Sequence, residues 1–276
     1  MRNRKRSAST VACGFAKNMI TLTTDFGASS PYVAAMKGVI LSINPEVRIV
    51  DVSHSVPPQQ VWAGAQVLDE VTRLFPAGTI HVAVVDPGVG TSRAIVYAEI
   101  AGGRYVCPDN GLLGRLAERE SPSKIVHVTS ERFFRKSVAP TFHGRDIMAP
   151  VAAHLSLGLD PDELGPRLTQ LRRLDWPGAV KVANRIEGEV VAVDSFGNLV
   201  TNITREMLAG VPTDETVAIR CDEHETHSIF TTYAEQPPMT LVAVIGSNDQ
   251  LELAIVDDSA TGMLGVGVGA AVEVCW

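Results

Sequence analysis

Residues 79–93 read TIHVAVVDPGVGTSR, a short apolar run that passes directly into a loop rich in glycine. The run from Thr79 to Val85 consists mainly of β-branched and small apolar side chains, which is typical of a strand covered on both faces. Strands of this kind belong to parallel sheets, in which helices form the crossover connections. We therefore predict an α/β domain built around this strand, with the loop carrying Asp86 and Arg93 at its carboxyl end.

The sequence on both sides of this strand alternates between strand and helix signals. Ser30 followed by Pro31 marks a helix start, and Asn44-Pro45 marks its end. Two further helices are predicted over 61–75, where apolar residues recur at helical spacing, and over 145–157. Additional strands are predicted at 20–24, 47–52, 94–100, 105–107 and 125–128. This rhythm predicts a mostly parallel sheet with helices on both faces.

The second half of the chain has a different pattern of residues, without the alternation of strand and helix signals. Prolines punctuate a polar stretch over 155–180, which we interpret as a linker. Short strands separated by Gly, Asn and Asp follow, and they predict a small all-β barrel or sandwich. These strands are expected at 187–193, 216–221, 239–245, 251–256 and 272–276. The predicted organisation is a disordered N-terminal arm at 1–18, an α/β domain at 19–176 and a β-barrel domain at 184–276.

Composition narrows the class of protein. The net charge is -7, from 24 Lys plus Arg against 31 Asp plus Glu, which argues against a nucleic-acid backbone as partner. No apolar run approaches the ~20 residues needed to span a bilayer. The basic N-terminus lacks the apolar stretch of a signal peptide and could be translation upstream of Met19. The four cysteines form no C-x-x-C pair, so we expect reduced thiols in a cytoplasmic protein.

Polar residues follow the predicted parallel strands, where ligands bind in open α/β sheets. Asp25 could accept hydrogen bonds from a ribose diol, or it could be a solvated loop acid or a helix cap. Asp86 and Arg93 could face one cavity and hold each other charged, or they could belong to a tight turn. Asp51 and His54 imitate a metal pair, but two ligands without a third do not make a site, so no metal or other cofactor is expected.

Two further segments carry candidate site residues. His143 lies in PTFHGRD, directly before a predicted helix, where a single histidine is usually structural or exposed, although its turn-like setting favours a site. VDSFGNLVTN places Asp194, Phe196 and Asn198 around one glycine. Phe196 could stack on a planar base and Asn198 could pair with an adenine edge, or the segment could be an ordinary β-turn.

Taken together, these segments resemble the S-adenosylmethionine hydrolase family, also called hydroxide adenosyltransferases, which is related to fluorinases and chlorinases. The resemblance covers roughly Ile20 to Trp276, and its segments occur in the family's order. They are TLTTDFG, GVILSINP, DVSHSVPP, AGAQVL, VVDPGVGTSR, PDNGLL, PTFHGRD and DSFGNLVTNI.

The resemblance implies hydrolysis of S-adenosyl-L-methionine to adenosine and L-methionine, by attack of water on the ribose C5′. It also implies a homotrimer whose active site lies between the N-terminal domain of one subunit and the C-terminal domain of the next. Asp25 matches the acid that holds the ribose hydroxyls, and Asp86, Arg93 and His143 match the set that marks the water-using branch. We expect Arg93 and His143 to donate hydrogen bonds to the water, and Asp86 to orient them and to accept the proton, directly or through His143.

The resemblance assigns the remaining substrate contacts to both domains. Asp194 matches the acid near the methionine amino group, although DSFGN is one residue shorter than the fluorinase pattern. Phe196 and Asn198 match adenine-side positions. The methionine end is assigned to Ser30 to Tyr32 and to Ser247 with Asn248, and a backbone stretch near adenine to Ile255–Asp257, centred on Val256.

Two alternative functions differ from hydrolysis. A halide-using enzyme would make a 5′-halo-adenosine, but the fluorinase-type site has Tyr where this chain has Asp86 and Ser where it has Gly144. A carboxylate close to a halide is disfavoured by like charge. A non-catalytic sensor would bind S-adenosylmethionine or adenosine without turnover, and such a protein would not need the Asp86, Arg93 and His143 set.

Overall fold

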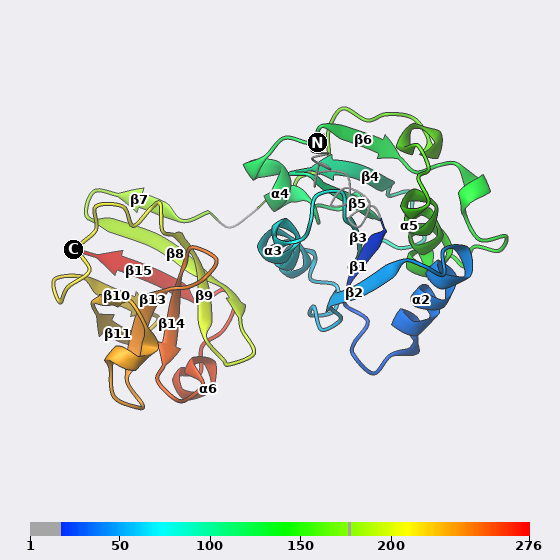
Figure 1. The fold of residues 1–276 in the computed structure, drawn as a ribbon. Coiled ribbons are helices and arrows are strands. Elements are labelled where there is room, and N and C mark those ends of the chain that lie inside the picture. Colours follow the sequence, from blue (N-terminus) through cyan, green and yellow to red (C-terminus); the bar gives the residue numbers. More distant parts are fainter. Residues whose placement is uncertain (1–17, 176–177) are drawn as a thin grey trace, which may run out of the picture. The chain divides into compact units, whose positions relative to one another are not determined.

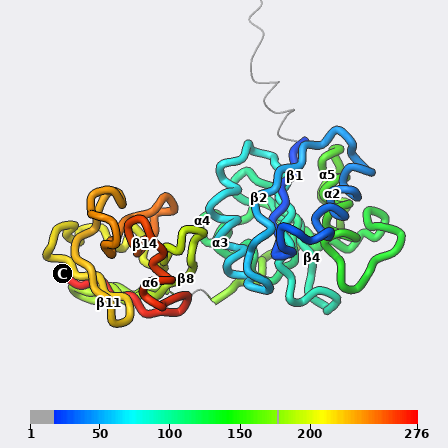
Figure 2. The backbone as a smooth tube through the Cα atoms, turned by 90° about the horizontal axis from the view of Figure 1, so that it is seen from below, coloured from blue at the N-terminus to red at the C-terminus, as the bar shows by residue number. Residues whose placement is uncertain are grey.

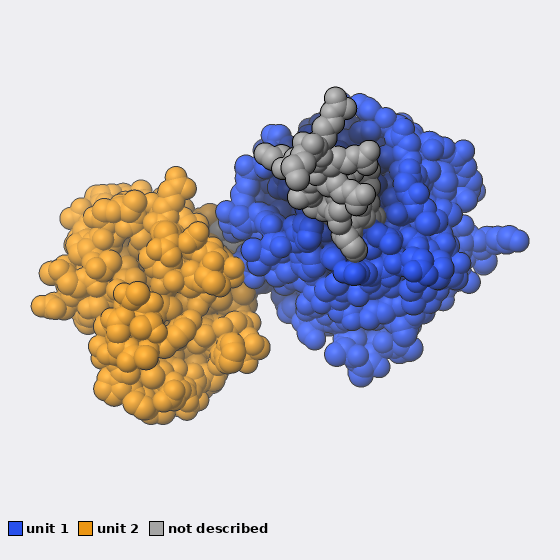
Figure 3. All heavy atoms as spheres, viewed as in Figure 1, with its two compact units in different colours: residues 1–174 blue, residues 175–276 orange. Residues whose placement is uncertain are grey.

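The computed structural model describes residues 18–175 and 178–276. The chain divides between Leu174 and Asp175 into two compact units, coloured separately in Figure 3. Each unit has its own hydrophobic core.

The first unit is built on a six-stranded sheet with the order β2-β1-β3-β5-β4-β6. Strands β2, β1, β3 and β5 pair in parallel, and β4 is antiparallel to both of its neighbours. The strands are β1 Met19–Thr24, β2 Arg48–Ser53, β3 Ile80–Val84, β4 Ile95–Ile100, β5 Gly103–Pro108 and β6 Lys124–His127. The prediction of a mostly parallel sheet is therefore confirmed.

Helices cover both faces of this sheet, as Figure 1 shows. They are α2 Pro31–Ile43, α3 Val61–Val71, α4 Gly114–Arg119 and α5 Ala149–Ser156, with a π-helical turn at Gly144–Met148. In both Figure 1 and Figure 2, α2 lies beside α5, with which it packs. Val82 and Val84 of β3 join the core on the α2 and α5 side, whereas Ala83 and Val85 join the core on the α3 and α4 side. The central strand is buried on both faces, as its apolar run predicts.

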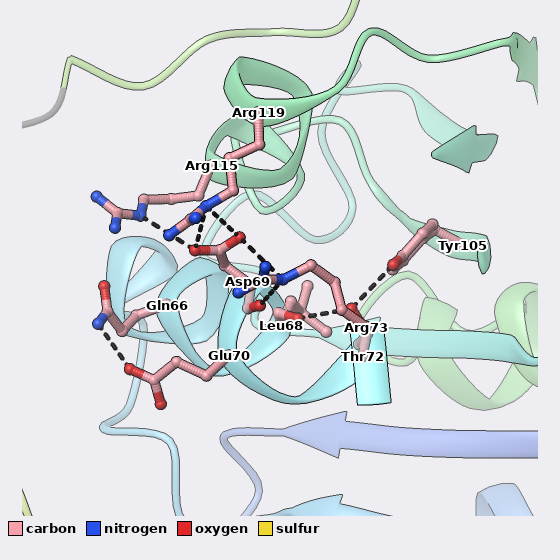
Figure 4. Close-up of polar contacts among 9 residues, drawn as sticks. All are labelled: Gln66, Leu68, Asp69, Glu70, Thr72, Arg73, Tyr105, Arg115 and Arg119. Carbon is pink, nitrogen blue, oxygen red and sulfur yellow. Dashed lines mark hydrogen bonds and ion pairs between the residues drawn. The ribbon is translucent and has the colours of Figure 1, made fainter. Parts of the chain in front are cut away.

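A buried carboxylate joins α3 to α4. Asp69 of α3 has a side chain only 4% exposed, and Nε of Arg119 on α4 lies 3.0 Å from its Oδ2. Arg115 and Arg73 approach the same carboxylate at 3.8 and 3.9 Å, and Figure 4 shows the three arginines around it. The pairing compensates the cost of removing one charge from water.

The stretch interpreted as a linker packs on the first unit over most of its length. The backbone N–H of His127 donates to Pro166 at 2.8 Å, and that of Leu168 donates to Ile125 at 3.0 Å. Arg167 forms an antiparallel bridge with Val126. The polar, proline-containing sequence thus lies along the β6 edge of the sheet, where a chain without regular structure can satisfy unpaired backbone groups.

The second unit is almost entirely β structure. Its sheet has the order β11-β10-β15-β8-β9-β14-β13-β12, with β7 paired to β8, and it forms a nearly closed, barrel-like arrangement. The strands are β7 Val180–Val182, β8 Arg185–Val193, β9 Leu199–Thr204, β10 Ala218–Cys221, β11 His224–His227, β12 Ile229–Phe230, β13 Leu241–Ile245, β14 Gln250–Ile255 and β15 Ala271–Cys275, and the helix is α6 Ala260–Leu264. The predicted all-β, barrel-like second half is confirmed.

Several expectations concern the termini and the surroundings of the protein. The predicted arm at 1–18 lies outside the described residues except for Asn18, whose side chain donates to the Glu46 carbonyl at 3.1 Å. Of the four cysteines, Cys107, Cys221 and Cys275 are free, and Cys13 is outside the described residues. Over residues 18–175 and 178–276, none of the helices combines the length and the apolarity that a bilayer crossing requires.

Candidate active site

A cleft of about 270 Å³ opens at the carboxyl ends of β1 and β3 in the first unit. Such positions favour ligand binding because loops diverge there around the ends of parallel strands. Asp25 follows β1, Asp86 follows β3, and His143 precedes the π-helical turn. The residues that line the cleft include Asp25, Phe26, Gln59, Asp86, Phe142 and His143.

The loop from Asp86 to Arg93 is held against the segment that carries His143. Gly90 has a φ of 80°, and a Cβ built on it would lie 2.7 Å from the carbonyl oxygen of Pro140. A side chain is therefore excluded both by the backbone conformation and by space. This close approach explains why the loop contains glycine, and it places Arg93 next to His143.

Asp86 and Arg93 form a buried ion pair. Nε of Arg93 donates to both carboxylate oxygens of Asp86, at 2.8 and 3.0 Å, and Nη2 adds a third short contact. The two side chains are only 4% and 7% exposed. A forked contact of this kind fixes the guanidinium plane, and burial strengthens the attraction between the charges.

His143 completes the cluster through Arg93. Its Nδ1 lies 3.0 Å from Nη2 of Arg93. Since a guanidinium has only donors, Nδ1 must accept, and the proton of the neutral ring is assigned to Nε2. Burial lowers the pKa of His143, and the positive charge of Arg93 lowers it further. The structure thus presents His143 as a neutral hydrogen-bond donor through Nε2.

Asp146, which was not predicted as a site residue, fixes the segment before His143. Its carboxylate is fully buried and accepts from Arg145, from Arg135 and from the backbone N–H of Ala139, at 2.7 to 2.9 Å. Burial alone would raise the pKa of Asp146, but these hydrogen bonds outweigh it and hold the pKa at about 2. The signal was present in PTFHGRD, whose last residue is this aspartate.

Asp25 lies in the same cleft, and its orientation is set by a neighbouring loop. The backbone N–H of Gln59 donates to Asp25 Oδ2 at 2.8 Å. Gln59 itself was not predicted as a site residue, because a backbone donor leaves no mark in the sequence. The cleft therefore combines a carboxylate able to accept hydrogen bonds from hydroxyl groups with Asp86 and His143, which Arg93 joins through its hydrogen bonds.

Ser30 and Tyr32 lie near one wall of the cleft. The hydroxyl of Ser30 accepts from the backbone N–H of Tyr32 at 3.3 Å and caps α2, as the sequence predicts. The Tyr32 ring is 53% exposed and meets Phe26 and Phe142 edge-on, with centroids 5.7 and 5.2 Å apart. These aromatic rings give the cleft an apolar border next to its charged cluster.

The remaining predicted residues belong to the second unit. Asp194 accepts from the backbone N–H groups of Phe196 and Asn198, both at 2.8 Å, and from the Asn198 amide at 2.9 Å. This is the β-turn arrangement that the sequence left open, and it leaves the Phe196 ring 78% exposed. Ser247 and Asn248 lie in the turn between β13 and β14.

Strand pairing relates two of the predicted second-unit residues, Asn198 and Val256. Val256 directly follows β14 and is buried. Val200 of β9 pairs with Glu252 of β14. Since side chains alternate along strands, Asn198 and Val256 share a face of this part of the sheet.

Asp51 and His54 do not gather further ligands. Within the described residues, no group of three His, Cys, Asp or Glu side chains is arranged to hold a metal ion. Asp51 pairs instead with Lys37 Nζ at 2.6 Å and lies 3.0 Å from His54 Nε2.

Comparison with known proteins decides the family. Residues 20–165 match the model of the SAM hydroxide adenosyltransferase N-terminal domain, and residues 188–273 match that of the C-terminal domain. The chain belongs to the SAM hydroxide adenosyltransferase family. Each match falls within one of the two units of the fold, and the resemblance to this family is thereby confirmed.

Curated relatives of this chain include hydrolases and, at lower identity, a fluorinase. A protein of Salinispora tropica named (R)-S-adenosyl-L-methionine hydrolase is 36% identical over 92% of this chain and 97% of its own length. One of the same name from Thermus thermophilus is 36% identical over 91% of this chain and 96% of its own length. A fluorinase of Nocardia brasiliensis is more distant, at 31% identity over 68% of this chain and 71% of its own length.

The fold of the chain also has a close match among solved structures. A crystal structure of an uncharacterized conserved protein from Thermotoga maritima superposes with a TM-score of 0.88 at 36% identity. It covers 94% of this chain and 100% of the Thermotoga chain.

Proposed function

We propose that this protein hydrolyses S-adenosyl-L-methionine at the ribose C5′–sulfur bond and releases adenosine and L-methionine. The observation that carries the proposal is the convergence of Asp86 and His143 in one cleft that also holds Asp25, with Arg93 hydrogen-bonded to both Asp86 and His143. The names of the full-length relatives point to the same reaction. The donors of Arg93 and His143 suit a small oxygen nucleophile. Asp25 supplies the hydrogen-bond acceptor that a ribose diol requires.

The difficulty of the reaction lies in the nucleophile, because free water has a pKa of about 15.7. Arg93 is a fixed cation, and His143 donates through Nε2, so both stabilise the hydroxide character that develops on the attacking oxygen. The assigned tautomer of His143 excludes one of the two expected routes for the proton of the attacking water, the route through His143. His143 has no free acceptor atom in this state, which leaves Asp86 as the carboxylate that could take the proton.

The leaving group needs no comparable help. Methionine departs from a sulfonium as a neutral thioether, so no general acid is required. The attacking oxygen gains negative charge as it nears a positively charged sulfonium, and their attraction grows where the bound substrate displaces bulk solvent from the cleft. Asp25 would set the line of attack by holding the ribose.

Water is favoured over halide by the charge of the cleft. The carboxylate of Asp86 is present where a halide would have to lose its hydration, and like charges repel strongly at low dielectric. The test is to incubate the purified protein with S-adenosyl-L-methionine in buffers that differ only in chloride or fluoride. Adenosine and methionine in equal amounts, at a rate indifferent to halide, support hydrolysis. A halo-adenosine product, or ligand binding without any product, contradicts it.

We also propose a cytoplasmic homotrimer whose active sites are completed by a neighbouring subunit. Three lines support this. Family contacts divide between the two units of the chain, the Phe196 ring is left exposed at a predicted adenine position, and the described cysteines are free, as in a reducing compartment. In such an assembly the second unit of one copy would supply the adenine and methionine contacts to the cleft of the next.

A further inference from the structure

Thr24 and His54 form a polar contact directly behind Asp25. Thr24 ends β1 and is fully buried, and its hydroxyl oxygen lies 3.0 Å from Nδ1 of His54. The side chain of His54, which follows β2, is 12% exposed. Because β1 and β2 pair in parallel, their carboxyl ends lie side by side, and the two residues meet there.

The surroundings of His54 fix the direction of this hydrogen bond. Its Nε2 lies 3.0 Å from Asp51 Oδ1, a close electrostatic contact without the alignment of a hydrogen bond. The negative charge of Asp51 favours the ring proton on Nε2, so Nδ1 is left as an acceptor. The hydroxyl of Thr24 then donates to Nδ1 and can accept from the backbone N–H of Phe26, at 3.3 Å.

Similar contacts hold the residues immediately before and after Asp25. The Thr24 hydroxyl links the residue before Asp25 to the residue after it. The backbone N–H of Gly27 donates to the His54 carbonyl at 2.7 Å. Farther along the same loop, Gln59 donates to Asp25 Oδ2. The loop after β2 thus holds the turn after β1 at three points, and the Asp25 carboxylate lies between them.

We propose that His54 is a positioning residue that acts through Thr24 to hold Asp25 in the orientation that grips a ribose diol. The inference rests on the proposed function, because it assigns Asp25 to the ribose of the substrate. His54 and Thr24 do not contact the substrate themselves. Their effect is on preorganisation: Asp25 meets the two hydroxyls without first having to be ordered.

Thr23 provides a matched control one residue away. It is also buried, at 1% exposure, but its hydroxyl has no hydrogen-bond partner within the described part of the chain. Thr23→Val therefore removes a hydroxyl from the same strand without removing a contact. Thr24→Val removes the hydroxyl that contacts His54, and Thr24→Ser restores it.

The experiment compares adenosine with 2′,3′-dideoxyadenosine, which lacks both ribose hydroxyls, by calorimetry on the full chain. The quantity measured is the ratio of the two dissociation constants, which reports the grip on the diol. We expect Thr24→Val and His54→Leu to reduce this ratio about tenfold, as loss of a buried hydrogen bond implies. Thr23→Val and Thr24→Ser should keep the ratio of the unmodified protein.

A merely structural role would weaken both ligands equally and leave the ratio unchanged, and that result would overturn the inference. If Thr24→Val does not fold, His54→Asn and His54→Leu give the same comparison, since the Asn side chain carries an acceptor and Leu does not. Equal ratios for these two variants would also overturn it. The measurement needs no turnover, so it is separable from the proposed function: an unmodified protein that does not prefer the diol contradicts the assignment of Asp25 instead.

Discussion

At the scale of single residues, the tautomer of His143 decides what that side chain can do. With Nδ1 accepting from Arg93, the ring acts as a donor through Nε2. His143→Gln can place an amide N–H near that position, whereas His143→Ala cannot. We expect kcat of the Gln variant to stay within about tenfold of the unmodified enzyme and that of the Ala variant to fall by about 10²–10³. Steady-state kinetics with S-adenosyl-L-methionine measure both, and equal losses would contradict the donor role.

The lowered pKa of His143 leads to a pH prediction. The neutral ring that accepts from Arg93 persists down to the folded-state pKa, which burial and the charge of Arg93 place below the usual 6.5. The kcat of the enzyme should therefore stay level as the pH falls through 6.5 and decline only at lower pH. A decline centred at 6.5 or above would show that the ring is not held neutral in this way.

At the scale of elements, Asp146 determines where the His143 segment lies. Replacing it with Asn leaves Arg135 and Arg145 without their carboxylate, and because these arginines are 44% and 29% exposed, the loss of their hydrogen bonds costs about 1–3 kcal/mol. We expect a matching loss in the free energy of unfolding, measured by urea denaturation, together with loss of activity. Asp162→Asn is the control, because Asp162 is 41% exposed and its ion pairs with Arg167 and Lys124 lie at the surface, where each should contribute less than about 1 kcal/mol.

The same carboxylate gives stability a defined pH dependence. The pKa of Asp146 is about 2 in the folded protein, below the value of about 3.9 for an unfolded aspartate. Its contribution is therefore complete above about pH 4 and is lost as the pH falls toward 2. Denaturation at a series of pH values should show this loss in the unmodified protein and a smaller one in Asp146→Asn. Parallel curves for the two proteins would contradict the role of Asp146.

Elements also show what a sequence can and cannot reveal. The β3 run and the Ser30-Pro31 helix start are local patterns, and both appear in the structure as predicted. The π-helical turn at Gly144–Met148 changes helical spacing by one residue, which periodicity over the 145–157 window does not resolve. Helix α4 has only six residues, too few for a periodic signal. The prolines and polar residues of the 155–180 stretch predict a linker, and they do not reveal its contacts with the β6 edge, because those contacts are made by the backbone, which carries no sequence pattern.

The candidate site was predictable only in part for a related reason. The resemblance to the family implied that Asp86, Arg93 and His143 form a set. The direction of the Arg93–His143 hydrogen bond, the support from Asp146 and the donor from Gln59 depend on three-dimensional contacts between distant segments.

At the scale of the whole molecule, the predicted active site draws on both units. If it is shared between subunits, a protein inactivated in the first unit by Asp86→Asn and one inactivated in the second unit by Asn198→Ala should regain activity when mixed after brief unfolding. Only a site that combines an intact first unit from one subunit with an intact second unit from another subunit regains activity. The mass in solution should be three times the 29.5 kDa of the chain. A monomeric mass, or mixed proteins as inactive as their parents, would contradict the shared site.

The central claim is that the cleft delivers an oxygen from water to the ribose C5′, and isotope labelling tests it most directly. The purified protein is incubated with S-adenosyl-L-methionine in water enriched in oxygen-18, and the two products are analysed by mass spectrometry. The account predicts one heavy oxygen in the 5′-hydroxyl of adenosine and none in methionine. Label in methionine, or unlabelled adenosine, would contradict it.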